Sequence, residues 1–389
     1  MKKDTSFRVV VGVLAFLSVA GVAAWIFQLM QGLEVTGMNN GVSWGLYITT
    51  FMFFVGLSAG GLIVASSASV FGVKKYKRVA KPAVLLSTIC IIAAAVLVVI
   101  DLGNAGRIFN LLLHPNFSSP LMWDVVVISS YLIINLLYLW FMTRKNPDDA
   151  KIAVVSRFAL PVAILVHSVT AWIFGLQIAK VGWFSAVMAP LFVASALDSG
   201  LALLLIVLVM LNATGAFKTG KELIGSLAGL LATCIAIDGF LVFCELLTMG
   251  YPGGHEAEYL ALLMTGPTAP FFWGELILGI AVPFLILVFR KCREKTALVV
   301  LASTLVVLGV FFKRVWLLCT AFVALNVPGA PGVMSGNNML GDPGWSLMGA
   351  YVPTAVEVVI VVGVIALSAL AYMLLAHKVF GEQSAMQEA

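Results

Sequence analysis

Two ionisable residues lie deep inside apolar stretches that are long enough to cross a lipid bilayer. His167 lies within the stretch 153–178, and Asp198 lies within the stretch 185–211, in the run Ala196–Gly200. An ionisable side chain at that depth is costly unless it is paired or faces water, so it indicates a functional site. The alternative for each residue is a structural hydrogen bond between two helices. We therefore treat both residues as candidates for proton transfer.

Two adjacent basic residues, Lys313 and Arg314, also lie inside an apolar stretch. A buried cation without an acidic partner is strongly destabilising, so both residues require carboxylates nearby. The candidate partners are Asp198, Asp238 and Glu245, which lie in other apolar stretches. These residues predict a buried ion-pair network, whose role is either proton transfer or the locking of helices together.

The chain offers few ligands for a haem or a metal ion. His114 and His255 lie in predicted loops, His377 lies at the end of the last apolar stretch, and His167 alone lies well inside one. A haem held by two histidines inside the membrane needs two such residues facing each other. The five cysteines show no clustered spacing of the kind that iron–sulfur or zinc sites require. The sequence therefore predicts no haem and no metal in this chain.

The elements that position these residues are long apolar helices. The chain has 389 residues, of which 61% are hydrophobic and 11% are charged, whereas soluble domains contain about 25% charged residues. An apolar run of about 20 residues spans the hydrocarbon core of a bilayer. The sequence thus predicts an all-α integral membrane protein with about ten transmembrane helices, at 9–31, 44–72, 82–102, 120–142, 153–178, 185–211, 223–247, 270–290, 297–325 and 350–376.

Basic residues are distributed unequally between the two sets of loops. Most of the 23 Lys and Arg residues flank one set of helix ends, whereas the opposite loops contain Arg107 and Lys180. By the positive-inside rule both termini are cytoplasmic and the longer loops lie outside. The net charge of +5 arises from short loops and gives no reason to expect a nucleic-acid partner. The buried ionisable residues then lie in the outer half, which favours a half-channel that exchanges protons with the outside.

A weak internal repeat divides the helices into two groups. Trp44 precedes Gly60 by the same number of residues that separates Phe184 from Gly200. A second match aligns the helix starts at 120–124 and 270–275. Repeats of the same orientation imply an axis along the membrane normal. We expect one membrane domain over 1–389, with helix 1 at 9–31, a first four-helix bundle at 44–178, a second four-helix bundle at 185–325 and helix 10 at 350–376.

The outer-half residues suit a neutral, lipid-soluble molecule that gains or loses protons. A quinone head group needs hydrogen bonds at its two oxygens and an acid or base nearby. His, Asp and Glu side chains beside apolar and aromatic walls supply both. A secondary transporter is the rival interpretation, because glycines at 60–61 and 200 could break helices. A transporter also needs polar side chains through the inner half, which has only Ser and Thr.

Several motifs together resemble the NrfD-like family of polysulfide reductase membrane subunits. They are Trp44-Gly45 with Gly60-Gly61, Asp101-Leu102-Gly103 with Arg107, Ser118–Asp124, His167-Ser168 and Ala196–Gly200. The resemblance covers predicted helices 2–9. It implies a quinone-interacting membrane anchor without haem, for which menaquinone or ubiquinone is exchangeable. It also implies a four-cluster ferredoxin-like iron–sulfur subunit on the outer face, joined to a molybdopterin catalytic subunit.

Carried over by position, the resemblance implies the residues of two sites. The quinone site is bordered by Asn40, Trp44, Asp101 and Arg107. The proton route contains His167 and Asp198, to which we add Glu245. The ion-pair network predicted above would contain Asp238, Lys313 and Arg314. Family members with eight helices exist, so the roles of predicted helices 1 and 10, and of Glu357 within helix 10, stay open.

We therefore expect a subunit of the bacterial cytoplasmic (inner) membrane that serves anaerobic respiration as the quinone-reactive part of an oxidoreductase complex. It would carry no redox centre of its own. Electrons would pass between the quinone pool and the extracytoplasmic iron–sulfur subunit, with menaquinol oxidation as the favoured direction and protons exchanged outside. The alternatives within the family are a redox-driven proton pump and a passive anchor without a quinone site.

Overall fold

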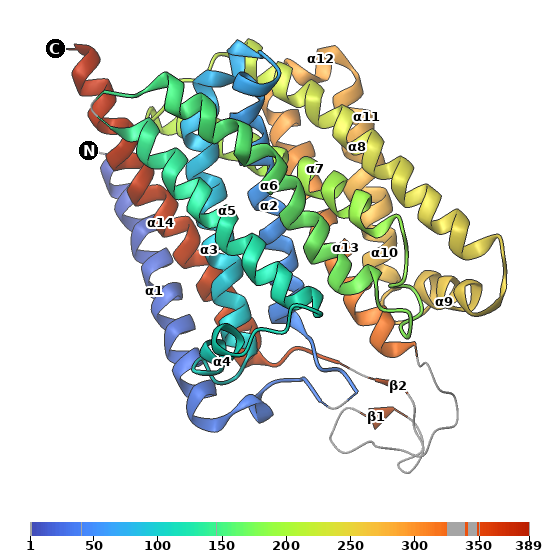
Figure 1. Cartoon of the computed structure of the whole chain (residues 1–389). Helices are drawn as coiled ribbons and strands as arrows, with labels where there is room; N and C mark the ends of the chain where they lie inside the picture. Colours follow the sequence, from blue (N-terminus) through green and yellow to red (C-terminus); the bar gives the residue numbers. More distant parts are fainter. Residues whose placement is uncertain are drawn as a thin grey trace.

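The computed structural model describes residues 2–39, 41–144, 146–324, 339–340, 348–349 and 351–388. Within these ranges, ten helical segments are long and apolar enough to cross a membrane. They stand side by side as one bundle, and both chain ends lie at the same end of it (Figure 1). This architecture confirms the prediction of an all-α integral membrane protein with about ten transmembrane helices.

Most crossings are single helices, and one is built from α10, the π-helix η3 and α11 in series. The crossing elements are α1 (Lys2–Gln31), α2 (Leu46–Val70), α3 (Ala80–Asp101), α5 (Pro120–Thr143), α6 (Asp149–Gly175), α7 (Met188–Thr214), α8 (Lys221–Gly250), α10 (Ala269–Gly274), η3 (Glu275–Ala281), α11 (Val282–Val288), α13 (Thr296–Val323) and α14 (Ala355–Glu388). The shorter elements are η1 (Leu33–Val35), η2 (Lys74–Val79), α4 (Arg107–Leu113), α9 (Gly254–Thr265), α12 (Arg290–Arg293) and the antiparallel pair β1 (Met339–Leu340) and β2 (Met348–Gly349).

Several helix boundaries follow from the local sequence. Asp148 caps α6 by accepting hydrogen bonds from the backbone N–H groups of Ala150 and Lys151, since the first N–H groups of a helix lack partners within it. The bond from Lys151 is the main reason why the pKa of Asp148 lies below its usual range. Pro120 begins α5, at a position where its missing N–H costs nothing. Gly215 ends α7 with a φ of 79°, a left-handed conformation that glycine adopts without strain.

Helix packing separates two groups of crossing helices, with α1 and α14 to one side. In the first group α2 packs against α3 and α6, and α5 packs against the same two helices. In the second group α8 and α13 both pack against α7 and against the composite crossing. α1 lies along α14, which also contacts α2 and α3 (Figure 1). This grouping is compatible with the bundles predicted at 44–178 and 185–325, whose repeat relationship stays a prediction.

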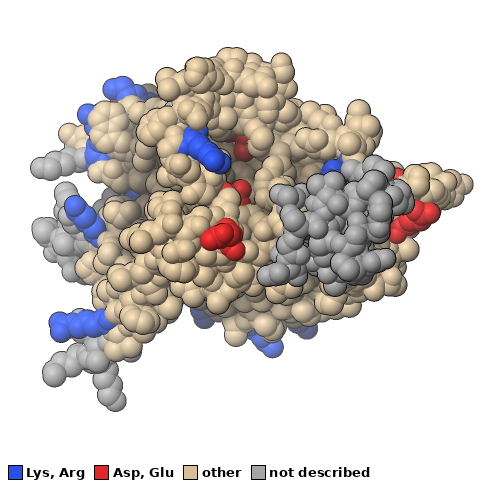
Figure 2. Space-filling model, turned by 90° about the horizontal axis from the view of Figure 1, so that it is seen from below, with Lys and Arg blue, Asp and Glu red and all other residues tan. Residues whose placement is uncertain are grey.

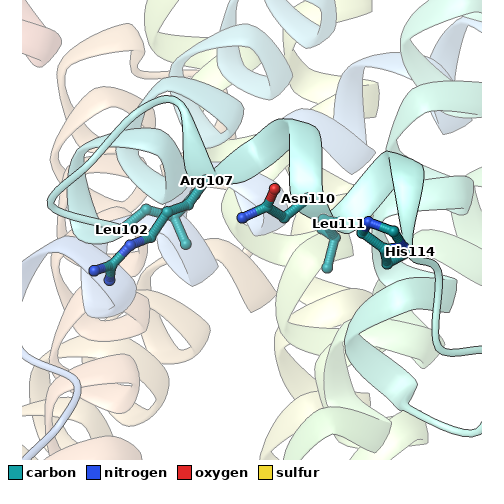
Figure 3. Close-up of a pocket in the computed structure, with 5 residues that line it drawn as sticks. All are labelled: Leu102, Arg107, Asn110, Leu111 and His114. Carbon is teal, nitrogen blue, oxygen red and sulfur yellow. The ribbon is translucent and has the colours of Figure 1, made fainter.

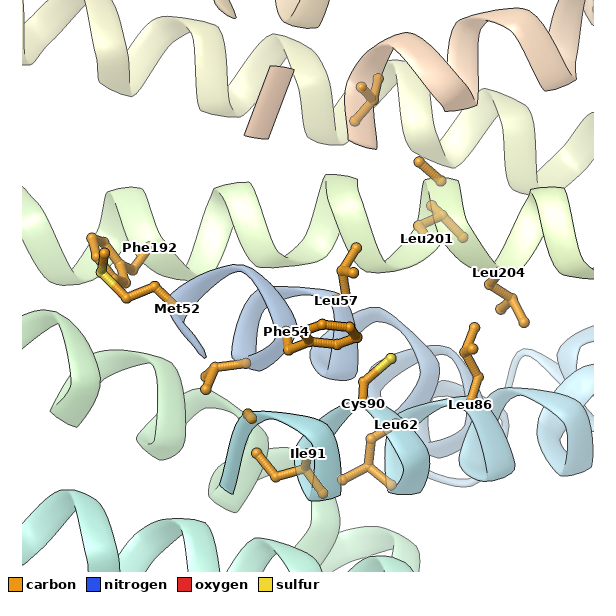
Figure 4. Packing of buried hydrophobic residues seen from close by; sticks show 14 of the residues in the cluster. Met52, Phe54, Leu57, Leu62, Leu86, Cys90, Ile91, Phe192, Leu201 and Leu204 are labelled. Atoms are coloured by element: carbon orange, nitrogen blue, oxygen red, sulfur yellow. The ribbon is translucent and has the colours of Figure 1, made fainter. Parts of the chain in front are cut away.

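The two groups meet where α2 crosses α7. A Cβ atom on Gly60 would collide with the backbone of Gly200, and a Cβ atom on Gly200 would collide with the backbone of Gly60. The helices therefore approach backbone to backbone, which only small residues permit. Around the crossing, apolar side chains of α2, α3 and α7 fill the core, among them Leu57, Cys90 and Leu204 (Figure 4). This contact fixes the two helix groups relative to each other.

A similar close approach joins α1 to α14, and it gives a matched test. A Cβ atom on Gly21 would collide with the backbone of Gly363, whereas nothing lies within 4 Å of a Cβ atom on Gly12 of the same helix. We expect Gly21→Val to lower the free energy of unfolding by about 1–3 kcal/mol, because the added side chain forces the two helices apart. Gly12→Val is the control. Equal thermal unfolding midpoints of the two variants in detergent would contradict the close packing of α1 on α14.

The two ends of the bundle differ in charge and in loop length. The chain ends, η2 and α12 lie at one end of the bundle (Figure 1). Most of the Lys and Arg residues lie in or next to the segments at this end, and we call it the basic end. The opposite end carries η1, α4, α9, β1 and β2, and we call it the loop-rich end (Figure 1). Most of the predicted site residues lie towards the loop-rich end of their helices.

Candidate functional site

A cluster of polar side chains lies at the loop-rich end between α1, α2, α3 and α14. We call it the loop-end cluster, and it contains Gln28, Tyr47, Asp101, Tyr351 and Glu357. The Tyr47 hydroxyl donates a hydrogen bond to Gln28 Oε1 (2.5 Å), and both side chains are fully buried. Oδ1 of Asp101 is also buried, and no described residue forms a hydrogen bond with it. Gln28 also donates through Nε2 to the carbonyl of Ile100 (3.2 Å), the residue before Asp101. The cluster thus combines an unpaired carboxylate oxygen with a phenol that Gln28 links to the same end of α3.

Glu357 connects this cluster to the segment that precedes α2. Its buried carboxylate accepts hydrogen bonds from the backbone N–H groups of Gly37 and Thr354 (both 2.8 Å) and from the Tyr351 hydroxyl (2.6 Å). The Tyr351 hydroxyl in turn accepts a hydrogen bond from the N–H group of Leu46 (2.7 Å). One carboxylate of α14 therefore holds both ends of the segment 37–46. Sequence reasoning assigned no role to Glu357, although an acid inside an apolar helix was a signal for one.

Trp44, a predicted quinone residue, lies in a different environment from the loop-end cluster. Its ring packs edge-on against Phe174 (centroids 5.8 Å apart) and stacks on Trp183 (6.2 Å). The Trp183 indole donates a hydrogen bond to the carbonyl of Leu317 (2.8 Å), which ties this aromatic group to α13. We call Trp44, Phe174 and Trp183 the aromatic group. Trp44 and Tyr47 are less than one helical turn apart in sequence, yet Trp44 packs in the aromatic group whereas Tyr47 belongs to the loop-end cluster.

Arg107, a second predicted quinone residue, is exposed and lines an open pocket on α4. The pocket has a volume of about 440 Å³ and is lined by Leu102, Arg107, Asn110, Leu111 and His114 (Figure 3). Leu102 directly follows Asp101, so the pocket adjoins the end of α3. Asn40, also predicted for the quinone site, lies outside the described residues. The described members of that predicted set thus belong to three environments, namely the loop-end cluster, the aromatic group and the α4 pocket.

The ionisable residues of the second helix group form a buried ion cluster. Lys313 Nζ lies 3.0 Å from an oxygen of Asp238 and 3.2 Å from Oε1 of Glu275, and all three side chains are almost completely buried. The second oxygen of Glu275 accepts a hydrogen bond from the indole of Trp316 (2.5 Å). The structure therefore brings Lys313 and Asp238 together, as the predicted network requires. It adds Glu275, which sequence reasoning did not select.

Glu275, which contacts Lys313, is the first residue of a local π-helix. Glu275 begins η3, and the wider turn of a π-helix shifts its side chains relative to an α-helix. One turn later, a Cβ atom on Gly279 would collide with the backbone of Gly309 in α13. The composite crossing therefore touches α13 directly, and Glu275 lies against the face that carries Lys313. Single-turn π segments are frequent at functional sites.

Several buried polar atoms near the ion cluster lack a hydrogen-bond partner among the described residues. Arg314 donates through Nη2 to Ser195 Oγ (2.7 Å) and its guanidinium lies 4.0 Å from the ring centroid of Phe192, but its Nε and Nη1 are unpaired. Oδ1 of Asp198 and Nε2 of His167 are also buried and unpaired. Buried donors and acceptors of this kind are normally satisfied, often by ordered water. His167 on α6, Asp198 on α7 and Arg314 on α13 therefore each present a buried polar atom that is free to form a further hydrogen bond.

Glu245 lies nearer to the loop-rich end than the ion cluster. Its Oε2 accepts a hydrogen bond from Ser185 Oγ (2.7 Å), in the segment before α7. It lies two turns along α8 from Asp238, between the ion cluster and the loop-rich surface. Asp124 of α5 is another buried acid, which the sequence analysis did not include among the site residues. It accepts a hydrogen bond from the Thr170 hydroxyl (2.6 Å). Glu245 thus lies between Asp238 and the end of α8 at the loop-rich surface.

Figure 2 views the loop-rich end directly. Acidic atoms are visible inside a hollow near the middle of this face, with a basic side chain beside it. Among the described residues, no three His, Cys, Asp or Glu side chains gather in the way that metal ligands do. The charged side chains that this view shows near the middle of the face are therefore carboxylates in and beside the hollow and a basic side chain next to it.

The chain matches the family model described as polysulphide reductase, NrfD, over residues 34–326. A Halobacterium salinarum protein described as a membrane subunit of dimethyl sulfoxide reductase is 38% identical over 388 residues, which cover 93% of this chain and 88% of the relative. The Hdr-like menaquinol oxidoreductase integral membrane subunit of Archaeoglobus fulgidus is 31% identical, covering 79% and 77%. A polysulfide reductase chain of Wolinella succinogenes is 28% identical, covering 72% and 94%.

Proposed function

The chain belongs to the polysulphide reductase NrfD family, and from that membership we propose that it is the membrane subunit of a respiratory oxidoreductase complex. In this proposal it passes electrons between the quinone pool and an iron–sulfur partner, with menaquinol oxidation as the favoured direction. The relatives named above are components of reductases or of a menaquinol oxidoreductase, which supports the assignment. One observation in this chain carries it, namely the unpaired, buried oxygen of Asp101, which directly follows the Ile100 carbonyl that Gln28 links to Tyr47.

A carboxylate in this position suits the oxidation of a quinol. A quinol hydroxyl must lose its proton as the electrons leave, and a carboxylate within hydrogen-bond reach is a competent acceptor. Tyr47 already donates its proton to Gln28, so its oxygen can accept a hydrogen bond from the head group. The α4 pocket, with Arg107 and His114, adjoins the same end of α3. We propose that the head group binds between Asp101 and α4, with Asn40 and Trp44 at its border.

The proposed proton route continues through the second helix group. His167, Asp198 and Arg314 present unpaired buried atoms, and Glu245 with Ser185 lies between them and the loop-rich end. We propose that protons leave on that side. In the proposed orientation both termini are cytoplasmic and the loop-rich end is extracytoplasmic, in the bacterial cytoplasmic membrane. The iron–sulfur subunit would cover the loop-rich end, with a molybdopterin subunit beyond it, and this chain would carry neither haem nor metal.

The test is the quinol-dependent reduction of the partner's iron–sulfur clusters in the purified complex. Asp101→Asn is expected to slow that reaction at least about tenfold, because the amide cannot take the proton. Tyr47→Phe, which removes one hydrogen-bonding group, is expected to have a smaller effect. Reduction of the complex by an artificial donor serves as the control and should not change. Unaltered quinol-dependent rates in Asp101→Asn would favour a passive anchor.

A second candidate, redox-driven proton translocation, is favoured by the depth of the ion cluster. Lys313 shares two buried acids at the point where the composite crossing becomes a π-helix, and Asp198 adds an unpaired oxygen on α7. Asp198→Asn in proteoliposomes separates the two functions. A lower ratio of protons moved per electron, at an unchanged rate of electron transfer, would support translocation over simple release at the loop-rich end.

A further inference from the structure

A second polar pocket lies at the basic end, far along the helices from the loop-end cluster. It has a volume of about 600 Å³ and is formed by the start of α8 and by the region around α12. Its lining residues are Lys221, Glu222, Gly225, Ser226, Arg290, Arg293 and Glu294. Neither the proposed quinone site nor the proposed proton route uses any of them.

Arg293 lines this pocket, and its side chain lies along α8. A Cβ atom on Gly229 would collide with its Nη1, so the guanidinium lies across a glycine on α8. Gly229 is eight residues beyond Lys221, which corresponds to about 12 Å along a helix. Nε of Arg293 is buried and has no hydrogen-bond partner among the described residues. The positive charge of Arg293, which still has an unused N–H donor, therefore lies further along α8 than Lys221, away from the basic end.

The surrounding charges leave the pocket with an excess of cations. Arg290 and Glu294 are both exposed and 3.9 Å apart, and an exposed pair at that distance neutralises little. Lys75 of η2 donates a hydrogen bond to Ser226 Oγ in the pocket lining (2.6 Å), which adds a cation from the first helix group. Together with Lys221 and Arg293, these cations outnumber the two lining carboxylates. The pocket thus favours an anion.

Three exposed apolar residues lie close in sequence to the pocket lining. Val288 and Phe289 directly precede Arg290, and Leu230 directly follows Gly229, across which Arg293 lies. The segments that supply the cations thus also supply exposed apolar side chains. A small anion would use only the polar part, whereas an amphiphile with an anionic head group would use both parts.

We propose that this pocket binds the phosphate head group of an anionic phospholipid from the leaflet at the basic end. Arg293 and Lys221 donate hydrogen bonds to the phosphate oxygens, since charge-assisted bonds to phosphate are among the strongest that proteins form. Val288, Phe289 and Leu230 lie along an acyl chain. Basic pockets between transmembrane helices on the cytoplasmic side are a known type of phospholipid head-group site. The bound lipid would join α8 to α12 and, through Lys75, to the first helix group.

Native mass spectrometry of the full-length protein tests this proposal. The delipidated protein is titrated with cardiolipin, with phosphatidylglycerol and with phosphatidylcholine. We expect Arg293→Gln to weaken cardiolipin binding at least about fivefold and Arg293→Gln with Lys221→Gln to weaken it further, since each basic residue at a membrane surface adds about that factor. Lys151→Gln removes an exposed cation of the same end outside the pocket and should bind like the wild type.

Three results would overturn the proposal. Phosphatidylcholine could bind as tightly as the two anionic lipids, the pocket variants could retain wild-type binding, or excess inorganic phosphate could displace cardiolipin completely. The last result would assign the pocket to a free anion. If Arg293→Gln does not fold, Arg290→Gln with Lys221→Gln removes two exposed lining cations and must still weaken cardiolipin binding relative to Lys151→Gln.

Discussion

Replacing Lys313 with methionine is expected to lower the free energy of unfolding by about 3–5 kcal/mol, because it removes one partner of a buried ion cluster. The Lys313 ammonium lies about equally close to Asp238 and Glu275, at 3.0 and 3.2 Å. Without it, two carboxylates remain buried, and the neighbouring cation on α13, Arg314, already donates to Ser195. Methionine has a similar length and keeps the apolar contacts of the lysine stem, so the loss reports the charge. Thermal unfolding in detergent and the yield of folded protein measure it.

A triple variant distinguishes the charge effect from a packing effect. Lys313→Met combined with Asp238→Asn and Glu275→Gln removes all three charges and keeps the side-chain shapes. The triple variant should have a free energy of unfolding much closer to the wild type than Lys313→Met has, since replacing a complete buried ion cluster costs far less than removing one partner from it. Lys151→Met is the control at an exposed pair. If Lys313→Met unfolds at the same temperature as the wild type, Asp238 and Glu275 do not need the lysine charge, and the ion cluster does not contribute to stability.

The same triple variant also separates the two roles that the sequence left open for this cluster. Helix locking requires only that α8, η3 and α13 remain packed. Proton transfer requires groups that change their protonation, and the triple variant has none at these positions. Wild-type electron transfer and proton movement in a stable triple variant would assign the cluster to structure alone.

The number of crossing helices could be predicted because it depends on the length of apolar runs, a local property. The short helices α4 and α9 were assigned to loops, since neither Arg107–Leu113 nor Gly254–Thr265 is long enough to give a transmembrane signal. The π-helix η3 was also not foreseen. It contains the contact between Gly279 and Gly309, which joins two segments that a single sequence does not place together.

The predicted site was resolved only in part for a similar reason. The distance of a residue from the end of its helix can be predicted from sequence, and these distances are similar for Lys313 and Asp238. The direction of each side chain is set by packing, so the sequence could not tell that Trp44 and Tyr47 enter different groups. It also could not tell that Glu245 would bind Ser185 rather than Lys313.

Replacing Glu357 with alanine is expected to lower the free energy of unfolding by at least about 2 kcal/mol, because three donors lose their acceptor at once. These donors are the N–H groups of Gly37 and Thr354 and the Tyr351 hydroxyl. Since Tyr351 also holds the N–H group of Leu46, the whole segment 37–46 should loosen. That segment precedes α2 and borders the proposed quinone site. We therefore also expect a higher KM for quinol, with a smaller change in kcat.

Two further variants make this expectation specific. Glu357→Gln keeps one oxygen that can accept from the backbone N–H groups, but its amide nitrogen cannot accept the hydrogen bond of the Tyr351 hydroxyl, so its effects should be intermediate. Glu34→Ala removes an exposed carboxylate from the same end and should change neither stability nor KM. Hydrogen exchange at the amides of Gly37 and Leu46 reports the segment directly. Faster exchange with an unchanged KM would mean that α14 supports only the fold and that the quinol binds elsewhere. Faster exchange with a raised KM would make Glu357 a positioning residue supplied by a helix outside the two main groups.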